Sequence, residues 1–357
     1  MCRILMTPFA GYSNQYSKLI SDILRSMGHE VVAATPKGLF PLKVFDRDDI
    51  DLFLVYWPNG FYKGSTKMRT LVKALTFLLL KYKLRKITYL MSIENFIAHD
   101  TDTEKLDMWV TKTLAAFAES LIFSTESAHQ HFVNLFPLFK DKKYHIIPHP
   151  SYDKIYCDCS YNRSFTREML KIPRNATVCL YLGLIRRYKG LNDFIDVFSA
   201  AYAPDRYVLI CGRFESEAAK KEITDKLSAQ PFEVQKNILI HGEFISDNDL
   251  PSYFVSSDFF AVNYVKEPAN PGSPVLAMGF GLPVYGSSSG CLPEILGLEN
   301  MYAFHPQSFD SKVNALEKAF SDCSRDKKAK RLIERNEKFH SQGVLSTRYK
   351  GVLEGLF

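Results

Sequence analysis

The sequence has few of the features that mark membrane-spanning, secreted or nucleic-acid-binding proteins. Its longest uninterrupted apolar run, Leu52 to Trp57, is far too short to span a bilayer. No signal peptide is recognisable before the first strand-like segment, so we expect a cytoplasmic protein. The net charge of +6 is modest for 357 residues, and no zinc-finger, RNP or helix-turn-helix pattern accompanies it. We therefore expect no nucleic-acid partner.

The sequence also lacks a pattern that would hold a metal or a nicotinamide cofactor. The seven cysteines are an odd number, and Cys157 and Cys159 have no second pair of the kind that a zinc site needs. Asp100 and Asp102 spell D-x-D, but they stand where a predicted helix begins, a position at which aspartate acts as a cap. The glycines of 279–286 do not form G-x-G-x-x-G. We predict neither a metal nor a bound cofactor.

Strand-like and helix-like segments alternate along the whole chain, which is typical of parallel sheets covered on both faces by helices. The alternation runs twice and is interrupted near 149–163, where the sequence is polar and rich in tyrosine. We predict an α/β fold of two Rossmann-like domains that face a central cleft, with ligands at the carboxyl ends of the strands. The predicted domains are 1–152 and 153–338, followed by a terminal helix within 339–357.

The predicted strands are short apolar runs bounded by polar or turn-forming residues. They lie near 3–9, 30–35, 51–57, 87–93, 120–125, 144–148, 177–183, 207–213, 237–241, 259–264, 283–287 and 301–304.

The most informative motif follows the seventh of these strands. The strand ends at Gly183, a basic segment with Arg186, Arg187 and Lys189 follows, and Gly190 opens an amphipathic stretch. A strand, a short turn and a helix start often form a phosphate site in α/β proteins. We predict that Arg186 and Lys189 bind a diphosphate and that Arg187 points outward. The alternative is a solvated basic loop.

A second motif lies about a hundred residues later, where a loop rich in Asn, Gly and Ser precedes a short apolar helix. We expect that helix over 274–280, because Pro274 suits a first turn and Gly281 suits the position after the helix. The backbone amides of Gly272 and Ser273 would then face the same anion as the basic turn.

Together the two motifs resemble the nucleotide-sugar-binding domain of GT-B glycosyltransferases of the family-4-like group. The first is similar to a G-x-x-R-x-x-K-G turn and the second to an N-x-G-S…A-M-x-x-G-x-P-V…P-E segment. The resemblance implies that Asn270 and Glu294 contact the sugar or nucleotide of the donor, and that no metal is required. It also implies that the first domain binds the acceptor, and that the last helix crosses back onto that domain.

Residues of the first half extend this resemblance. Gly11, Asn14 and Tyr16 belong to a segment similar to the family's acceptor-facing N-P-Y loop. Glu94 and His99 fall where related mannosyltransferases carry H-N…P-H-E, which implies that one of them is the general base of an inverting transfer. The alternatives are a surface or sugar-binding carboxylate for Glu94 and a hydrogen-bonded loop histidine for His99.

Within that group the resemblance is to bacterial exopolysaccharide and glycolipid mannosyltransferases. It implies GDP-mannose as donor, with a UDP-sugar as the alternative, and a saccharide or lipid-linked saccharide as acceptor. Leu276 departs from the pattern, because the family has a ribose-contacting glutamate there. In segment 63–86, lysines and arginines surround an apolar group. This segment would lie on an anionic membrane at the inner face of the cell, or be an ordinary helix packed on the sheet.

Three functions are therefore compatible with the sequence. The leading one is a hexosyltransferase that uses a nucleotide-diphosphate sugar in the synthesis of bacterial surface polysaccharide. The alternatives are an isomerase of the nucleotide-sugar 2-epimerase type with the same fold, and a sugar-binding protein without catalysis. Release of nucleoside diphosphate only when an acceptor is added would distinguish the first from the other two.

Overall fold

The computed structural model describes most of the chain as two compact units. The first unit comprises Met1–Pro150 with His340–Phe357, and the second comprises Ser151–Phe339. The described residues are 1–7, 14–33, 50–57, 88–96, 104–156 and 161–356. Gly11, His99, the D-x-D segment and the basic segment 63–86 lie outside these ranges.

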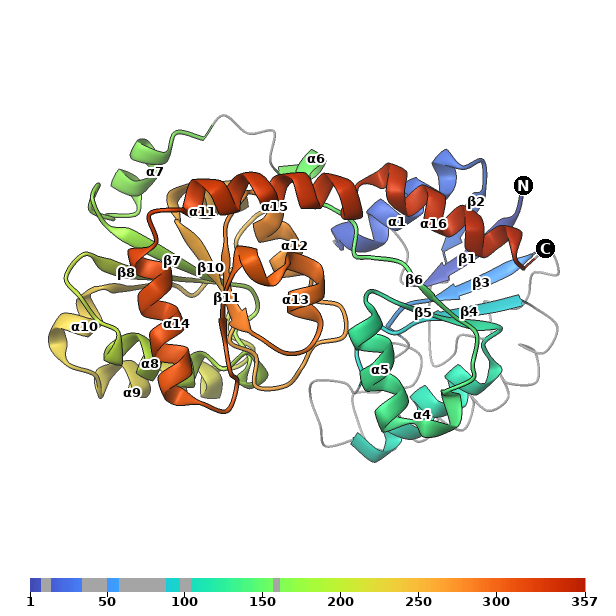
Figure 1. The fold of residues 1–357 in the computed structure, drawn as a ribbon, viewed down its shortest axis with the longest axis horizontal. Helices are drawn as coiled ribbons and strands as arrows, with labels where there is room; N and C mark the ends of the chain where they lie inside the picture. Colours follow the sequence, from blue (N-terminus) through green and yellow to red (C-terminus); the bar gives the residue numbers. More distant parts are fainter. Residues whose placement is uncertain (8–13, 34–49, 58–87, 97–103, 157–160, 357) are drawn as a thin grey trace. The chain divides into compact units, whose positions relative to one another are not determined.

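The first unit is built on one parallel sheet whose strand order is β2-β1-β3-β4-β5-β6 (Figure 1). The central strands β3 and β5 are buried along their whole length and β4 at all but its first residue, which explains why their sequences are mostly apolar runs without alternation. The strands are β1 Arg3–Thr7, β2 Glu30–Ala33, β3 Leu52–Val55, β4 Thr88–Ser92, β5 Ser120–Phe123 and β6 Tyr144–Ile146; the helical segments are α1 Gln15–Ser26, α4 Glu104–Phe117, α5 Glu126–Leu135, η2 Pro137–Phe139 and α16 Gln342–Glu354.

The last helix, α16, is part of the core of the first unit. Leu345 and Val352 of α16 are buried in one cluster with Ile20 of α1 and Leu54 of β3. The Tyr349 hydroxyl lies 2.7 Å from the hydroxyl of Tyr56, which directly follows β3. The C-terminal end of the chain therefore packs beside its N-terminal segments, as Figure 1 also shows for α16 and α1.

The second unit has a six-stranded parallel sheet of order β12-β11-β10-β7-β8-β9 (Figure 1). Its strands are β7 Thr177–Leu182, β8 Arg206–Cys211, β9 Ile238–His241, β10 Phe259–Ala261, β11 Val284–Ser287 and β12 Met301–Phe304. Its helical segments are α6 Asp153–Tyr156, α7 Arg163–Met169, η3 Arg187–Lys189, α8 Leu191–Ala200, α9 Glu217–Ser228, α10 Phe232–Lys236, α11 Leu250–Ser256, α12 Gly272–Gly279, α13 Cys291–Leu296, η4 Leu298–Asn300, α14 Phe309–Ser321 and α15 Arg325–His340. The strand order reverses between β7 and β10, which is where open α/β sheets bind ligands.

The predicted α/β fold is confirmed, because each unit is a six-stranded parallel sheet with flanking helices. Each of the twelve predicted strands corresponds to one strand of the structure. Among the helices that the structure describes, none combines the length and the apolarity needed to cross a membrane.

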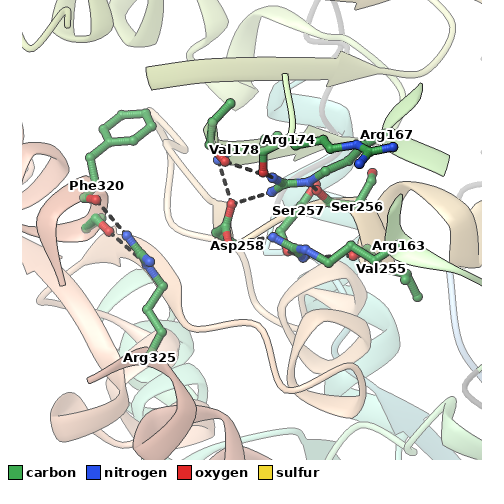
Figure 2. Close-up of polar contacts among 12 residues, drawn as sticks. Arg163, Arg167, Arg174, Val178, Val255, Ser256, Ser257, Asp258, Phe320 and Arg325 are labelled. Carbon is green, nitrogen blue, oxygen red and sulfur yellow. Dashed lines mark hydrogen bonds and ion pairs between the residues drawn. The ribbon is translucent and has the colours of Figure 1, made fainter. Parts of the chain in front are cut away.

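A buried charge network attaches α7 to the sheet of the second unit (Figure 2). The Asp258 carboxylate, just before β10, accepts hydrogen bonds from Arg163 at 2.6 Å, from Arg167 at 2.8 Å and from the backbone N–H of Val178 at 2.8 Å. The Arg167 side chain is only 5% exposed. Its remaining N–H groups donate to backbone carbonyls, including that of Ser256. One carboxylate thus neutralises a guanidinium that has almost no access to water.

We predict that Asp258→Ala lowers the free energy of unfolding by about 3–5 kcal/mol, because it leaves the Arg167 charge buried and unpaired. Urea denaturation followed by circular dichroism measures this change. Asp225→Ala is the matched control, since Asp225 pairs with Lys221 on the surface of α9, where both side chains are well exposed. Equal midpoints for the two variants would show that the network does not stabilise the unit.

Candidate functional site

The basic turn, residues 183–190, begins at the carboxyl end of β7. Gly183 has φ of 127°, a conformation that L-residues with side chains rarely adopt, and a Cβ atom there would overlap the Lys189 ammonium. Gly190 has φ of 71°, and a Cβ atom there would overlap the carbonyl of Asn263. Both glycines are therefore required for the turn to fold back over the end of its strand.

The Lys189 side chain is partly buried against this turn. Its ammonium has no ion pair with any residue that the structure describes. Burial, and to a smaller extent the nearby charge of Arg186, lowers the pKa of Lys189 to about 8. A cation at the carboxyl end of a parallel strand, with no counter-ion among the described residues, is suited to bind an anion.

The two arginines of the turn differ in their surroundings. Arg186 is about a quarter exposed, and its Nε lies 3.5 Å from Oε2 of Glu215. Arg187 is 80% exposed and pairs with Glu222 at 2.9 Å. Arg187 thus points outward, as predicted, whereas Arg186 lies close enough to Lys189 to affect its charge.

The loop that follows β10, residues 262–271, is tied to the basic turn. The Asn263 side chain donates to the carbonyl of Gly190 at 2.9 Å, and the backbone N–H of Val265 donates to the carbonyl of Tyr188 at 2.8 Å. Tyr264 shares a hydrogen bond of 3.1 Å with the hydroxyl of Ser273. The turn and the start of α12 are consequently connected through one short loop.

Helix α12 begins two residues earlier than predicted. It runs from Gly272 with Pro271 as its N-cap, so Gly272 and Ser273 are its first two residues, and Pro274 is the third. Proline is tolerated there because the N–H groups of the first turn have no partner within the helix. The correction leaves the predicted anion-binding amides at the helix start, where the helix dipole also favours negative charge.

The two residues predicted to contact the donor's sugar or nucleotide are placed differently. Asn270 is partly buried directly before α12. Glu294 is exposed on α13, and its carbonyl accepts from Arg335 of α15 at 2.7 Å. Because α13 follows β11, it is separated from β7 by the strand β10. Donor contacts of both residues stay predictions.

In the first unit, Glu94 is a buried carboxylate just past the carboxyl end of β4. It is 5% exposed, and its Oε1 accepts from the Ser92 hydroxyl at 2.6 Å and from the Tyr16 hydroxyl at 2.9 Å. The interpretation of Glu94 as a surface carboxylate is therefore wrong. Two hydroxyl donors to one oxygen fix the orientation of this carboxylate.

Aromatic rings surround Tyr16, which donates a hydrogen bond to Glu94. Tyr16 packs edge-on against Tyr56 and Trp57, and its ring lies 4.8 Å from that of His149. Burial chiefly, and Glu94 in addition, raise the pKa of Tyr16 well above its usual value, so its hydroxyl remains a donor. Asn14 accepts from the Tyr16 backbone N–H as the N-cap of α1, which is a structural role.

Comparison with known proteins bears on the second unit first. Residues 162–339 match the family model described as glycosyl transferases group 1. This match covers nearly all of the second unit, which we therefore call the group 1 domain. The predicted glycosyltransferase class is confirmed at this level, whereas the narrower family-4-like and mannosyltransferase resemblance stays a prediction. No curated protein sequence matches the chain.

Solved structures similar to the whole chain share its two-domain GT-B fold. HepE from Anabaena, in a structure with UDP and glucose, is 16% identical over 99% of this chain and 100% of its own, with a TM-score of 0.76. Sucrose-phosphate synthase from Thermosynechococcus elongatus is 16% identical over 100% and 99%, with a TM-score of 0.75. A glycosyltransferase from Rickettsia africae is 11% identical over 99% and 98%, with a TM-score of 0.73.

Several residues of these sites were missed by sequence reasoning. Ser92, Tyr56 and Asn263 all stand within two residues of the carboxyl end of a strand. That position is a usable signal in a parallel sheet. Tyr349 gives no such signal, because only the packing of α16 brings its hydroxyl to Tyr56.

We predict that the affinity of the group 1 domain for UDP or GDP falls about tenfold between pH 7 and pH 9. The predicted diphosphate contact requires the charged form of Lys189, and that form is lost as pH rises through the pKa of about 8. Calorimetric titration of the intact protein measures the change. Lys189→Met should bind more weakly at pH 7, by about tenfold or more, and lose the pH dependence. Identical profiles for wild type and variant would contradict the assignment.

Proposed function

We propose that the chain is a hexosyltransferase that moves a hexose from a nucleotide-diphosphate sugar to a saccharide or lipid-linked saccharide. The observation that carries this proposal is the Lys189 ammonium, which lies in the glycine turn of a group 1 domain and has no counter-ion among the residues that the structure describes. In this class of reaction, the anion expected to bind at such a position is the leaving nucleoside diphosphate.

The proposed chemistry needs no metal ion. As the glycosidic bond of the donor breaks, negative charge grows on the leaving phosphate oxygen. Lys189, Arg186 and the amides of Gly272 and Ser273 would stabilise that charge, because they are fixed before the reaction begins. Together they take the place that a divalent cation has in metal-dependent transfer.

Glu94 is the proposed general base of an inverting transfer, with His99 as the alternative outside the described residues. The hydrogen bonds from Ser92 and Tyr16 support this choice, since they orient the carboxylate. In this role Glu94 takes the proton of the acceptor hydroxyl as that oxygen attacks the anomeric carbon.

Both proposed donors are compatible with the diphosphate site, because that site would contact the phosphates of the donor and not its nucleobase. The sequence resemblance favours GDP-mannose. HepE, which has the same fold, is known in complex with UDP-glucose, which favours a UDP-hexose. We further propose that the acceptor belongs to bacterial surface polysaccharide synthesis. Segment 63–86 would then hold the protein on the inner face of the cytoplasmic membrane.

We predict acceptor-dependent release of GDP from GDP-mannose, or of UDP from a UDP-hexose, in the presence of excess chelator. Coupled detection of the free nucleoside diphosphate, with and without a lipid-linked saccharide extract, measures it. Sugar isomerisation without acceptor would indicate the epimerase-type alternative, and absence of both reactions a binding protein. A strict requirement for manganese or magnesium would contradict the proposed role of Lys189.

We predict that Glu94→Gln lowers turnover by about two to four orders of magnitude while nucleotide affinity is unchanged. The amide keeps the shape of the side chain but cannot accept a proton. Glu126→Gln is the matched control, because Glu126 is exposed at the start of α5 in the same unit. Wild-type turnover in Glu94→Gln, or a product with the anomeric configuration of the donor, would contradict base catalysis by Glu94.

A further inference from the structure

A second pocket lies in the group 1 domain, at the carboxyl ends of β10, β11 and β12. Its volume is about 530 Å³, within the range of small-molecule sites. Its polar lining includes Asp193, Asn263, Ser287, Ser289, Gln307 and Lys312. None of the residues assigned to the diphosphate lines it, so its chemistry is considered separately.

The floor of the second pocket is a built polar cluster. Oδ2 of Asp193 accepts from the Lys312 ammonium at 2.7 Å and from the Asn263 amide at 2.8 Å. Asn263 is 3% exposed, and the Lys312 side chain is 14% exposed. These groups are held in place before any ligand arrives, as a selective site requires.

A buried hydroxyl beside this floor is not satisfied by the protein. Tyr285 is fully buried, and its hydroxyl has no hydrogen-bond partner among the described residues. Burial chiefly, and the nearby Asp193 carboxylate in addition, raise the pKa of Tyr285, so the hydroxyl keeps its proton. Buried polar atoms are normally paired with protein, water or ligand. Tyr285 does not itself line the pocket, but its hydroxyl lies near Asp193, which does.

The charges of the lining favour a neutral ligand over an anion. Asp193 and Glu267 are negative, Lys312 is the only positive residue among the described lining residues, and its ammonium already pairs with Asp193. Among these residues a phosphate would therefore lie near two carboxylates and no unpaired cation. Hydroxyl and amide groups of Ser287, Ser289 and Gln307 can both donate and accept.

We propose that the second pocket is a saccharide-binding site for a neutral sugar unit, separate from the diphosphate site. Sugar hydroxyls both donate and accept, which matches the mixed polar lining. The apolar side chains of Val262, Leu292 and Phe304 complete the wall and suit the C–H face of a sugar ring.

The test uses the intact chain and the methyl α-D-glycosides of glucose, mannose and galactose, followed by saturation-transfer NMR at millimolar concentrations. At least one glycoside should bind, and excess UDP or GDP should not displace it. Ser289→Ala combined with Gln307→Ala should weaken binding about tenfold or more, and both positions are exposed, so the fold is expected to persist. Lys189→Met should lose nucleotide affinity but bind the glycoside as wild type does.

Maltose and cellobiose distinguish a glycan chain from a single sugar as the natural ligand. Tighter binding of a disaccharide would indicate a glycan chain, whereas equal binding would indicate a single sugar. Absence of binding by all these probes, displacement by nucleotide, or unchanged affinity in the folded double variant would overturn the proposal. Failure of the transferase assay alone would not, because the glycoside test does not depend on turnover.

Discussion

The structure of the group 1 domain around its site depends on one constraint, the placement of the Lys189 ammonium against Gly183. A partly buried cation is unfavourable without an anion, and the lowered pKa of Lys189 expresses that cost. The position is possible only because Gly183 and Gly190 adopt left-handed backbone conformations. Asn263 then fixes the turn from β10. A site prepared in this way would stabilise an incoming diphosphate without rearranging.

The first unit also holds a charged side chain in place at the end of a strand, but there the charge is negative. The Glu94 carboxylate stands past the end of β4, and hydroxyl groups of Ser92 and Tyr16 hold one of its oxygens. The Tyr16 ring packs on Tyr56, whose hydroxyl shares a hydrogen bond with that of Tyr349 on α16. The terminal helix is thus part of the support of this carboxylate, although it is far from it in sequence. Within each unit, considered by itself, the charged group lies at the carboxyl end of a parallel strand.

Much of this arrangement was predictable from sequence, for identifiable reasons. Buried parallel strands are continuous apolar runs, so all twelve were found. The basic turn was found because glycine, arginine and lysine follow such a run directly. The start of α12 differs from the prediction, because Pro274 is the third residue of the helix and not the first. The hydroxyl partner of Tyr56 was not predictable, since it depends on long-range packing of α16. His99 and segment 63–86 lie outside the described residues.

The most direct test of the central claim is a crystal structure of the intact protein with UDP or GDP bound at about pH 7. The account predicts β-phosphate oxygens within about 3 Å of the Lys189 Nζ and of the backbone amides of Gly272 and Ser273. A diphosphate bound elsewhere in the group 1 domain, with Lys189 making no contact to it, would contradict the account.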